Sequence, residues 1–319
     1  MPEAELESHP LSTALREATT RLRAAGVEGG RADAVALAAH LLRCDPGEVE
    51  RRAILGAPTP AGFDELVARR VARVPLQHLT GVAPFRHLEL SVGPGVFTPR
   101  PETEGLVDLA LAAVDALAAD VRADAGAPDP SAGPEPAAPG RAVQVVDLCT
   151  GSGAIAVSIA SERPAVRVAA VELSPQAHAF ARTNVDRLAP AVDLRLGDAT
   201  HAFEELLGAV DVVATNPPYI PDGAVPVDPE VREHDPALAL YGGGDGLELP
   251  MRLVARAAAL LRPGGVLLVE HGELQGEDLC ARLAATGAWY EIVDHRDLTG
   301  RPRVLRAVRA TGAPVDSNS

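Results

Sequence analysis

Apolar residues recur at every third or fourth position over much of residues 11–74, a spacing typical of amphipathic helices. Two such rows stand on either side of a stretch that contains Gly26, Gly29 and Gly30, and a further helix is expected over residues 63–71. The first row contains Leu15, Leu22 and Ala25, and the second contains Ala34, Ala38, Leu41 and Leu42. The pattern predicts a small helical domain over about residues 1–80.

The period changes to two between residues 85 and 97, where Leu88, Leu90 and Val92 alternate with polar residues or glycine. This alternation is typical of a β-strand. We therefore expect a short β connector over about residues 81–98 and a second, larger domain over residues 99–319.

The larger domain alternates predicted helices and strands. A helix is expected over about residues 102–121, and the Pro-, Ala- and Gly-rich stretch of about residues 124–141 predicts a disordered surface loop. Strands are then expected at residues 142–148, 167–173, 192–196, 211–215 and 265–270, with helices at 153–162, 175–188 and 247–261. Residues 289–295 and 303–310 are expected to form an antiparallel pair at one edge. This order predicts an α/β fold, an open and mostly parallel sheet with helices on both faces.

A glycine-containing loop follows the first strand of this sheet and opens a helix; it reads Asp147-Leu148-Cys149-Thr150-Gly151-Ser152-Gly153. Ligands of open parallel sheets bind beyond the carboxyl ends of the strands. The two glycines let the backbone turn sharply beneath a ligand, and the helix N-terminus offers N–H groups that suit a carboxylate. Glu172 ends the next strand, where it can accept ribose hydroxyls. Asp198 can meet an adenine amine, with Ala199 contributing packing beside it.

Two kinds of cofactor are compatible with this loop. Gly151, Gly153 and Ala156 also satisfy the dinucleotide fingerprint, so a nicotinamide-dependent oxidoreductase stays open. Asp147 before the glycines, with the other acidic residues around the site, favours S-adenosylmethionine. The sulfonium and ammonium groups of that cofactor tolerate carboxylates that a pyrophosphate would not.

A rigid polar turn, Asn216-Pro217-Pro218-Tyr219, follows the fourth strand. The prolines fix φ and carry no N–H, so the turn is expected to aim the Asn216 carboxamide oxygen and the Pro217 carbonyl at one point. Two acceptors so placed can hold an NH₂ group by both hydrogens, and the Tyr219 ring offers a face for stacking. Asn216, Pro217 and Tyr219 are thus the catalytic candidates, and all four residues are expected to bind the substrate.

This arrangement suits methyl transfer to an amide. An amide nitrogen is a poor nucleophile because its lone pair is delocalised into the carbonyl group. Holding both hydrogens orients that lone pair, and orientation of this kind can lower a barrier by roughly 7–11 kcal/mol. The nitrogen becomes strongly acidic as it is methylated, so we expect neither a dedicated strong base nor a metal.

Composition and charge narrow the classes of function. The chain has 319 residues with 44 acidic and 29 basic ones, and this net charge of −15 argues against holding bare nucleic acid by its phosphates. The three cysteines form no CxxC and the histidines show no metal-ligand spacing, so we expect free thiols and no metal site. No apolar run approaches about 18 residues, and the acidic start lacks a secretory pattern. We therefore expect a cytoplasmic protein without a membrane span.

Seven motifs together resemble the bacterial peptide-chain release factor glutamine methyltransferases, a family of seven-stranded, S-adenosylmethionine-dependent enzymes. They are PLQHLTG (75–81), FTPRPETE (97–104), VVDLCTGSGAIA (145–156), NPPYIP (216–221), YGGGDGL (241–247), LRPGGVLLVEHG (261–272) and DLTGRPR (297–303). NPPY alone is shared with enzymes that methylate exocyclic amines of adenine or cytosine. The combination with PRPETE and the N-terminal helices is more specific.

The resemblance implies a Rossmann-like, seven-stranded methyltransferase sheet and methylation of the glutamine in the Gly-Gly-Gln motif of translation release factors. It places the cofactor against Asp147, Cys149 to Gly153, Glu172, Asp198 and Ala199, and the target glutamine against Asn216 to Tyr219. Arg100, Glu102 and Glu104 of PRPETE are expected to close over the cofactor methionine. Cys149 stands where the family usually has glycine. A backbone torsion that only glycine adopts without strain is therefore not expected at this position.

We also expect the protein to be a monomer that binds release factors. Three alternative functions stay open. A glutamine methyltransferase of a large-subunit ribosomal protein is the rival within the same class. A DNA amino-methyltransferase shares the NPPY motif but needs a basic groove to extrude a base. An NAD-dependent oxidoreductase leaves the NPPY turn unexplained.

Overall fold

The structure, a computed structural model, describes residues 9–124 and 141–312. Its contacts divide the chain into two units, which are described separately below. The helical unit comprises Met1–Val82, Val92–Pro94 and Pro226–His234, and the sheet unit comprises Ala83–Ser91, Gly95–Val225 and Asp235–Ser319. The stretch of about residues 124–141, expected to be a disordered loop, lies outside the described residues except at its two ends.

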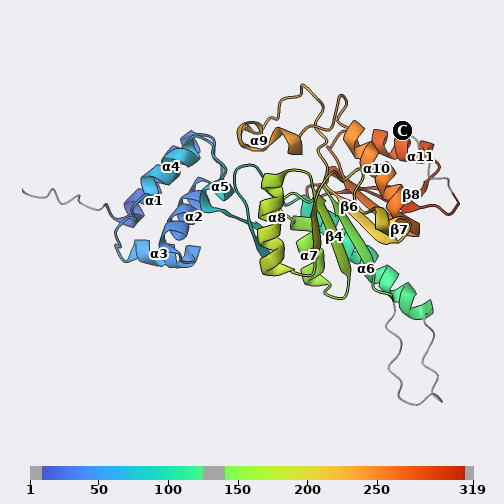
Figure 1. The fold of residues 1–319 in the computed structure, drawn as a ribbon. Helices are drawn as coiled ribbons and strands as arrows, with labels where there is room; N and C mark the ends of the chain where they lie inside the picture. Colours follow the sequence, from blue (N-terminus) through green and yellow to red (C-terminus); the bar gives the residue numbers. More distant parts are fainter. Residues whose placement is uncertain (1–8, 125–140, 313–319) are drawn as a thin grey trace, which may run out of the picture. The chain divides into compact units, whose positions relative to one another are not determined.

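Residues 9–80, the described part of this region, form five helices, all labelled in Figure 1. They are α1 (Leu11–Ala24), α2 (Gly30–Leu42), α3 (Pro46–Ile54), α4 (Phe63–Val71) and α5 (Leu76–Thr80). The two apolar rows lie on α1 and α2, where Leu15, Leu22, Ala34 and Ala38 are buried in one core. Helices at these positions, with α4 over residues 63–71, confirm the helices predicted for this region.

A segment from much later in the chain completes the helical unit. Glu230 of α9 (Pro229–His234) has its Oε1 2.8 Å from Arg70 Nη2 and 2.9 Å from Arg73 Nη2. Arg70 also donates to Asp33 Oδ2 at 2.7 Å, and its side chain is only 7% exposed. A cation this deeply buried requires paired acceptors. The sequence pattern does not predict α9, because a short charged helix has no apolar row.

The β connector is a hairpin of β1 (Val82–Phe85) and β2 (Leu88–Ser91) rather than one strand. The chain turns at Arg86, whose φ of 54° lies in the region that glycine and asparagine usually occupy. The Arg86 guanidinium is anchored to Glu162 at 2.5 Å, and its backbone N–H donates to Glu104 Oε1 at 3.0 Å. Tertiary contacts thus hold a turn for which the sequence carries no turn residue.

The sheet unit contains the seven-stranded sheet implied by the resemblance, and the predicted α/β fold is confirmed. In spatial order its strands are β5 (Asp193–Leu196), β4 (Arg167–Glu172), β3 (Gln144–Leu148), β6 (Val210–Thr215), β7 (Leu261–Glu270), β9 (Pro302–Arg309) and β8 (Trp289–Arg296). The first five are parallel, and β9 runs antiparallel to both β7 and β8. The expected antiparallel pair at one edge is therefore also confirmed.

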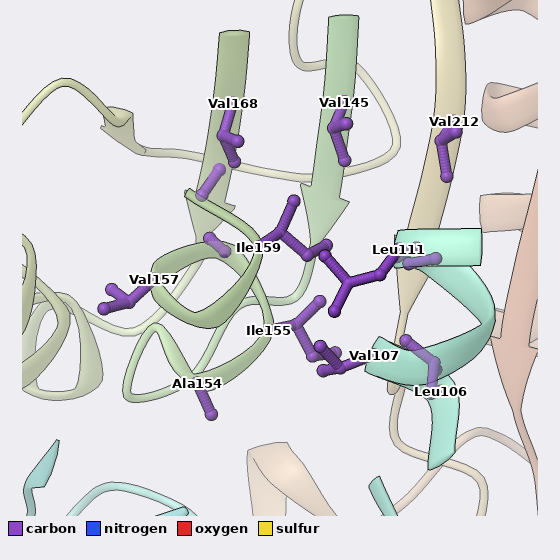
Figure 2. Close-up of a cluster of buried hydrophobic side chains, with 14 of the residues drawn as sticks. Leu106, Val107, Leu111, Val145, Ala154, Ile155, Val157, Ile159, Val168 and Val212 are labelled. Atoms are coloured by element: carbon purple, nitrogen blue, oxygen red, sulfur yellow. The ribbon is translucent and has the colours of Figure 1, made fainter. Parts of the chain in front are cut away.

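Helices cover both faces of this sheet. Three helices pack against one face, namely α6 (Thr103–Asp124), α7 (Ala154–Glu162) and α8 (Pro175–Leu188). Helices α10 (Glu248–Leu260) and α11 (Gly276–Ala285) pack against the other face. Figure 2 shows Val145 and Val168 of two adjacent strands directed toward α7, which carries Ile155 and Ile159, and Val212 of the next strand above Leu111 of α6. Their chain neighbours Val146, Ala169 and Val213 belong to the opposite core, as the period of two along a strand requires.

Strand register brings five carboxyl ends to one edge of the sheet. Leu148 pairs with Thr215, Thr215 pairs with Val269, and Glu172 pairs with Leu196. The residues just beyond these ends, together with Glu172 and Glu270 themselves, form the region described next.

Candidate active site

The glycine loop leaves β3 through alternating left-handed residues. Cys149, Gly151 and Gly153 have φ values of 63°, 59° and 87°. The torsion that glycine would take without strain is thus adopted here by Cys149, at a cost of about 1 kcal/mol. Contrary to expectation, cysteine is thus accommodated at this position in the left-handed conformation that the turn requires.

Asp147 holds this loop from inside the protein. Its side chain is fully buried, and its Oδ2 accepts from Thr150 Oγ1 at 2.5 Å and from the Ala156 N–H at 3.1 Å. Burial raises the pKa of Asp147 to about 7 despite these hydrogen bonds. Asn184 of α8 adds a second anchor, because its Nδ2 donates to the Ser152 carbonyl at 2.8 Å.

Glu172 also binds the loop directly. Its Oε2 accepts from the Gly151 N–H and its Oε1 from the Ser174 N–H, both at 2.8 Å. Burial raises the pKa of this carboxyl, and the backbone hydrogen bonds from Ser174 and Gly151 oppose that shift. Each carboxylate oxygen keeps a further lone pair, so Glu172 can orient the loop and still accept a ligand hydroxyl.

Asp198 and Ala199 follow β5 at the same edge. The Gly197 N–H donates to the Glu172 carbonyl at 2.9 Å, which joins the two strand ends. Asp198 is exposed, and its Oδ1 accepts from the backbone N–H and the hydroxyl of Thr200 at 2.8 and 2.7 Å. Ala199 is buried beneath it.

The chemistry of these residues fits S-adenosylmethionine. Glu172 and Asp198 carry acceptors of the kind that ribose hydroxyls and an adenine amine require, and the acidic surroundings suit a cation. A Cβ built on Gly151 would meet nothing within 4 Å, so the loop backbone is open on that side. Among residues 9–124 and 141–312, no cluster of His, Cys, Asp or Glu is arranged to hold a metal.

The Asn216–Tyr219 turn is held by close main-chain contacts with residues 241–247. The Ile220 N–H donates to the Leu240 carbonyl at 2.8 Å, and the Gly242 N–H donates to the Ile220 carbonyl at 2.9 Å. A Cβ on Gly246 would lie 2.3 Å from the Tyr219 carbonyl oxygen, and only glycine allows that approach. The YGGGDGL motif therefore supports the NPPY backbone.

Tyr219 is fixed from a second side by Gln275. The Gln275 amide donates to the Tyr219 carbonyl at 2.8 Å and accepts from the Gly272 N–H at 2.9 Å. Burial raises the pKa of Tyr219 to about 12, and the negative charge of Glu270 adds to the effect. The phenol is therefore neutral at physiological pH and presents an aromatic ring rather than a base.

Asn216 contacts two side chains that sequence reasoning missed. Its Nδ2 donates to Thr103 Oγ1 at 3.1 Å, and Thr103 in turn donates to Glu270 Oε2 at 2.7 Å. Glu270 ends a buried parallel strand, the same signal that singled out Glu172. Thr103 lies inside PRPETE, between the acidic residues of that motif.

Arg100 and Glu102 contact other parts of the sheet unit. Arg100 Nη2 lies 2.9 Å from Asp235 Oδ2, and its guanidinium lies over the Phe97 ring at 5.3 Å. Glu102 Oε1 lies 3.6 Å from Arg301 Nη2. Glu104 Oε1 accepts from the Arg86 N–H at 3.0 Å. The expected role of Arg100, Glu102 and Glu104 in holding the cofactor stays a prediction.

Comparison with known proteins gives first the class. Residues 136–229 match the family model described as the methyltransferase small domain, and residues 13–81 match the PrmC N-terminal domain. With the seven-stranded sheet and the glycine loop at its carboxyl edge, these matches define an S-adenosylmethionine-dependent methyltransferase.

The curated relatives then give the family. A release factor glutamine methyltransferase of Streptomyces coelicolor is 48% identical, over 92% of this chain and 96% of the relative. One of Mycolicibacterium smegmatis is 44% identical, over 94% and 98%. A 4-amino-L-phenylalanine/4-methylamino-L-phenylalanine methyltransferase of Streptomyces pristinaespiralis is 43% identical, over 88% and 89%. The chain belongs to the release factor glutamine methyltransferase family.

Proposed function

We propose that this enzyme methylates the side-chain nitrogen of the glutamine in the Gly-Gly-Gln motif of translation release factors. The observation that carries the proposal is the pairing of Leu148 with Thr215 on adjacent strands, because it brings the glycine loop and the Asn216–Tyr219 turn to neighbouring strand ends. Strong similarity to release factor glutamine methyltransferases supports the choice of substrate.

On the cofactor side, Glu172 would accept hydrogen bonds from the ribose hydroxyls, Asp198 would accept one from the adenine amine, and the Cys149–Gly153 loop would hold the amino-acid part. When bound, S-adenosylmethionine supplies a methyl group on a positively charged sulfur, which departs as a neutral thioether. Asp147 acts behind the loop by fixing Thr150 and Ala156.

On the target side, Asn216 Oδ1 and the Pro217 carbonyl accept the two hydrogens of the glutamine NH₂ group. This grip turns the nitrogen lone pair toward the methyl donor and limits rotation of the amide. Tyr219 packs its neutral ring against the planar amide. After the new N–C bond forms, the acidic nitrogen releases one proton to solvent.

A small aromatic amine is a second candidate substrate. The Streptomyces pristinaespiralis relative is named for 4-amino-L-phenylalanine, and an aniline NH₂ presents the same two hydrogens to Asn216 and Pro217. The protein substrate is favoured because several relatives named release factor glutamine methyltransferase match this chain at 42–48% identity over most of its length.

The proposed enzyme acts on protein rather than on bare nucleic acid, as a cytoplasmic monomer. The net charge of −15 supports the first part. In the part of the chain that the structure describes, no helix is long and apolar enough to span a bilayer.

The test is a methyl-transfer assay with labelled cofactor and five acceptors: a release factor, its Gly-Gly-Ala variant, the large-subunit ribosomal protein, 4-aminophenylalanine and bare DNA. We expect label on the release factor and none on its Gly-Gly-Ala variant. Label on the ribosomal protein or the free amino acid alone, or on bare DNA, would overturn the proposed substrate. Calorimetry with S-adenosylmethionine and with NAD tests the cofactor, and only the first is expected to bind.

A further inference from the structure

A buried hydrogen-bonded chain joins three elements behind Asn216. Thr103 stands at the start of α6 and is 4% exposed, and Glu270 ends β7 and is 2% exposed. Asn216 follows β6, and its Nδ2 lies 3.1 Å from Thr103 Oγ1, which lies 2.7 Å from Glu270 Oε2. All three residues belong to the sheet unit.

The direction of these hydrogen bonds follows from the chemistry of their groups. An ionised carboxylate only accepts, so the Thr103 hydroxyl proton points to Glu270. The Thr103 oxygen is then left to accept, and the amide nitrogen is the only donor on the Asn216 side chain. Asn216 also lowers the pKa of Glu270, as is expected when the amide nitrogen, not the oxygen, lies toward the carboxylate.

The amide oxygen of Asn216 is consequently directed away from Thr103 and Glu270. Among the described residues, Asn216 Oδ1 accepts no hydrogen bond. A flipped amide would present its NH₂ group to the NH₂ group of the substrate, donor against donor. The orientation set by Thr103 and Glu270 is the one that can hold the substrate.

We propose that Glu270 and Thr103 are positioning residues, which select the reactive orientation of the Asn216 carboxamide through an ionised carboxylate. This inference rests on the proposed function, in which Asn216 Oδ1 accepts from the methylated nitrogen. Neither residue needs to touch the cofactor or the target.

The surroundings of Glu270 make the orientation of the Asn216 amide dependent on pH. Burial raises the pKa of Glu270 to about 7, while the Thr103 hydrogen bond and Arg303 of β9 lower it, and Glu102 raises it. Tyr219 beside it is neutral, and His271, the next residue, has its Nε2 3.1 Å from Asp294 of β8.

Protonation reverses the hydrogen bonds. A protonated Glu270 can donate to Thr103, whose hydroxyl is then free to donate to Asn216 Oδ1 and stabilise the flipped amide. Because the carboxyl loses its proton as pH rises through about 7, the fraction of correctly oriented Asn216 rises in the same direction.

The experiment measures single-turnover methyl transfer to a release factor between about pH 5.5 and about pH 8.5. The wild-type rate is expected to rise through about pH 7. Glu270→Gln and Thr103→Val should lower the rate at high pH about ten- to hundredfold and remove the rise. Cofactor Kd, measured by calorimetry, should stay within about twofold of wild type, because neither residue contacts the cofactor.

Two matched variants separate positioning from structure. Thr103→Ser keeps the hydroxyl and should restore both the rate and the pH profile. Glu273→Gln removes an exposed carboxylate from the same strand end and should leave both unchanged. A wild-type pH profile in Glu270→Gln would overturn the inference while leaving the proposed function intact. Failure of the wild-type enzyme to methylate any release factor would instead overturn the proposed function.

Discussion

The cofactor side and the target side of the site share one edge of the sheet but are held in different ways. Glu172 accepts the Gly151 N–H of the glycine loop, and Asp147 accepts the Thr150 hydroxyl and the N–H of Ala156 in α7, so side chains at the strand ends fix the loop. The Asn216–Tyr219 turn depends instead on main-chain contacts that only glycine permits, and on Thr103 and Gln275. Substitutions should therefore disturb the two sides in different ways. The glycine loop should lose hydrogen bonds, and the backbone of the Asn216–Tyr219 turn should be displaced by steric overlap.

The largest effect is expected from Gly246→Ala. The new Cβ would lie 2.3 Å from the Tyr219 carbonyl oxygen, in a residue whose φ is 79°. We expect a loss of about 3 kcal/mol or more in the free energy of unfolding, measured by chemical denaturation.

Gly244→Ala in the same loop is the control. Its Cβ would meet only the flexible end of Glu248, at 3.1 Å, and the change should stay within about 0.5 kcal/mol. Equal effects of the two variants would contradict the claim that the loop supports the NPPY backbone by close contact.

Asn216→Ala comes next and tests the separation of the two sides. Loss of one positioned acceptor should raise the barrier by about 1–3 kcal/mol, a fall of about ten- to hundredfold in the single-turnover rate. Cofactor Kd should remain near the wild-type value, because the glycine loop is untouched. If Asn216→Ala lost cofactor binding but kept the wild-type rate at saturating cofactor, the target nitrogen would not be held by the Asn216–Tyr219 turn.

Glu172→Ala is expected to give the opposite result. It removes the acceptor for the Gly151 and Ser174 N–H groups as well as for the ribose, so cofactor Kd should rise by about tenfold. The rate at saturating cofactor should change less. Glu273→Ala, which removes an exposed carboxylate at the same edge, should leave Kd unchanged.

The smallest effect is expected at Cys149. Cys149→Gly relieves the left-handed torsion, whereas Cys149→Ala keeps the strain and removes only the thiol. The glycine variant should therefore be more stable than the alanine variant, by about 1 kcal/mol in denaturant unfolding. The reverse order would mean that the φ of 63° carries no strain.

The same contrast explains what could be predicted from the sequence. Glu172 and the glycine loop were predictable because their partners are close in the chain or follow from strand order. Thr103 and Glu270 were not predicted as site residues. The Asn216–Thr103 hydrogen bond joins residues 113 positions apart in the chain, and the Thr103–Glu270 hydrogen bond joins residues 167 positions apart. Arg86 forms its turn only through tertiary partners, so the hairpin had no local signal.

The helical unit is not continuous in the chain, and this affects how it can be made. Glu230 follows Arg73 by 157 residues, which a ribosome adding about 5–20 residues per second needs roughly 8–30 seconds to synthesise. Throughout that interval Arg70 has Asp33 but not Glu230 as a partner. The N-terminal helices thus complete their ion pairs only after β3 to β6 have been synthesised, so assembly of the first unit waits for most of the second.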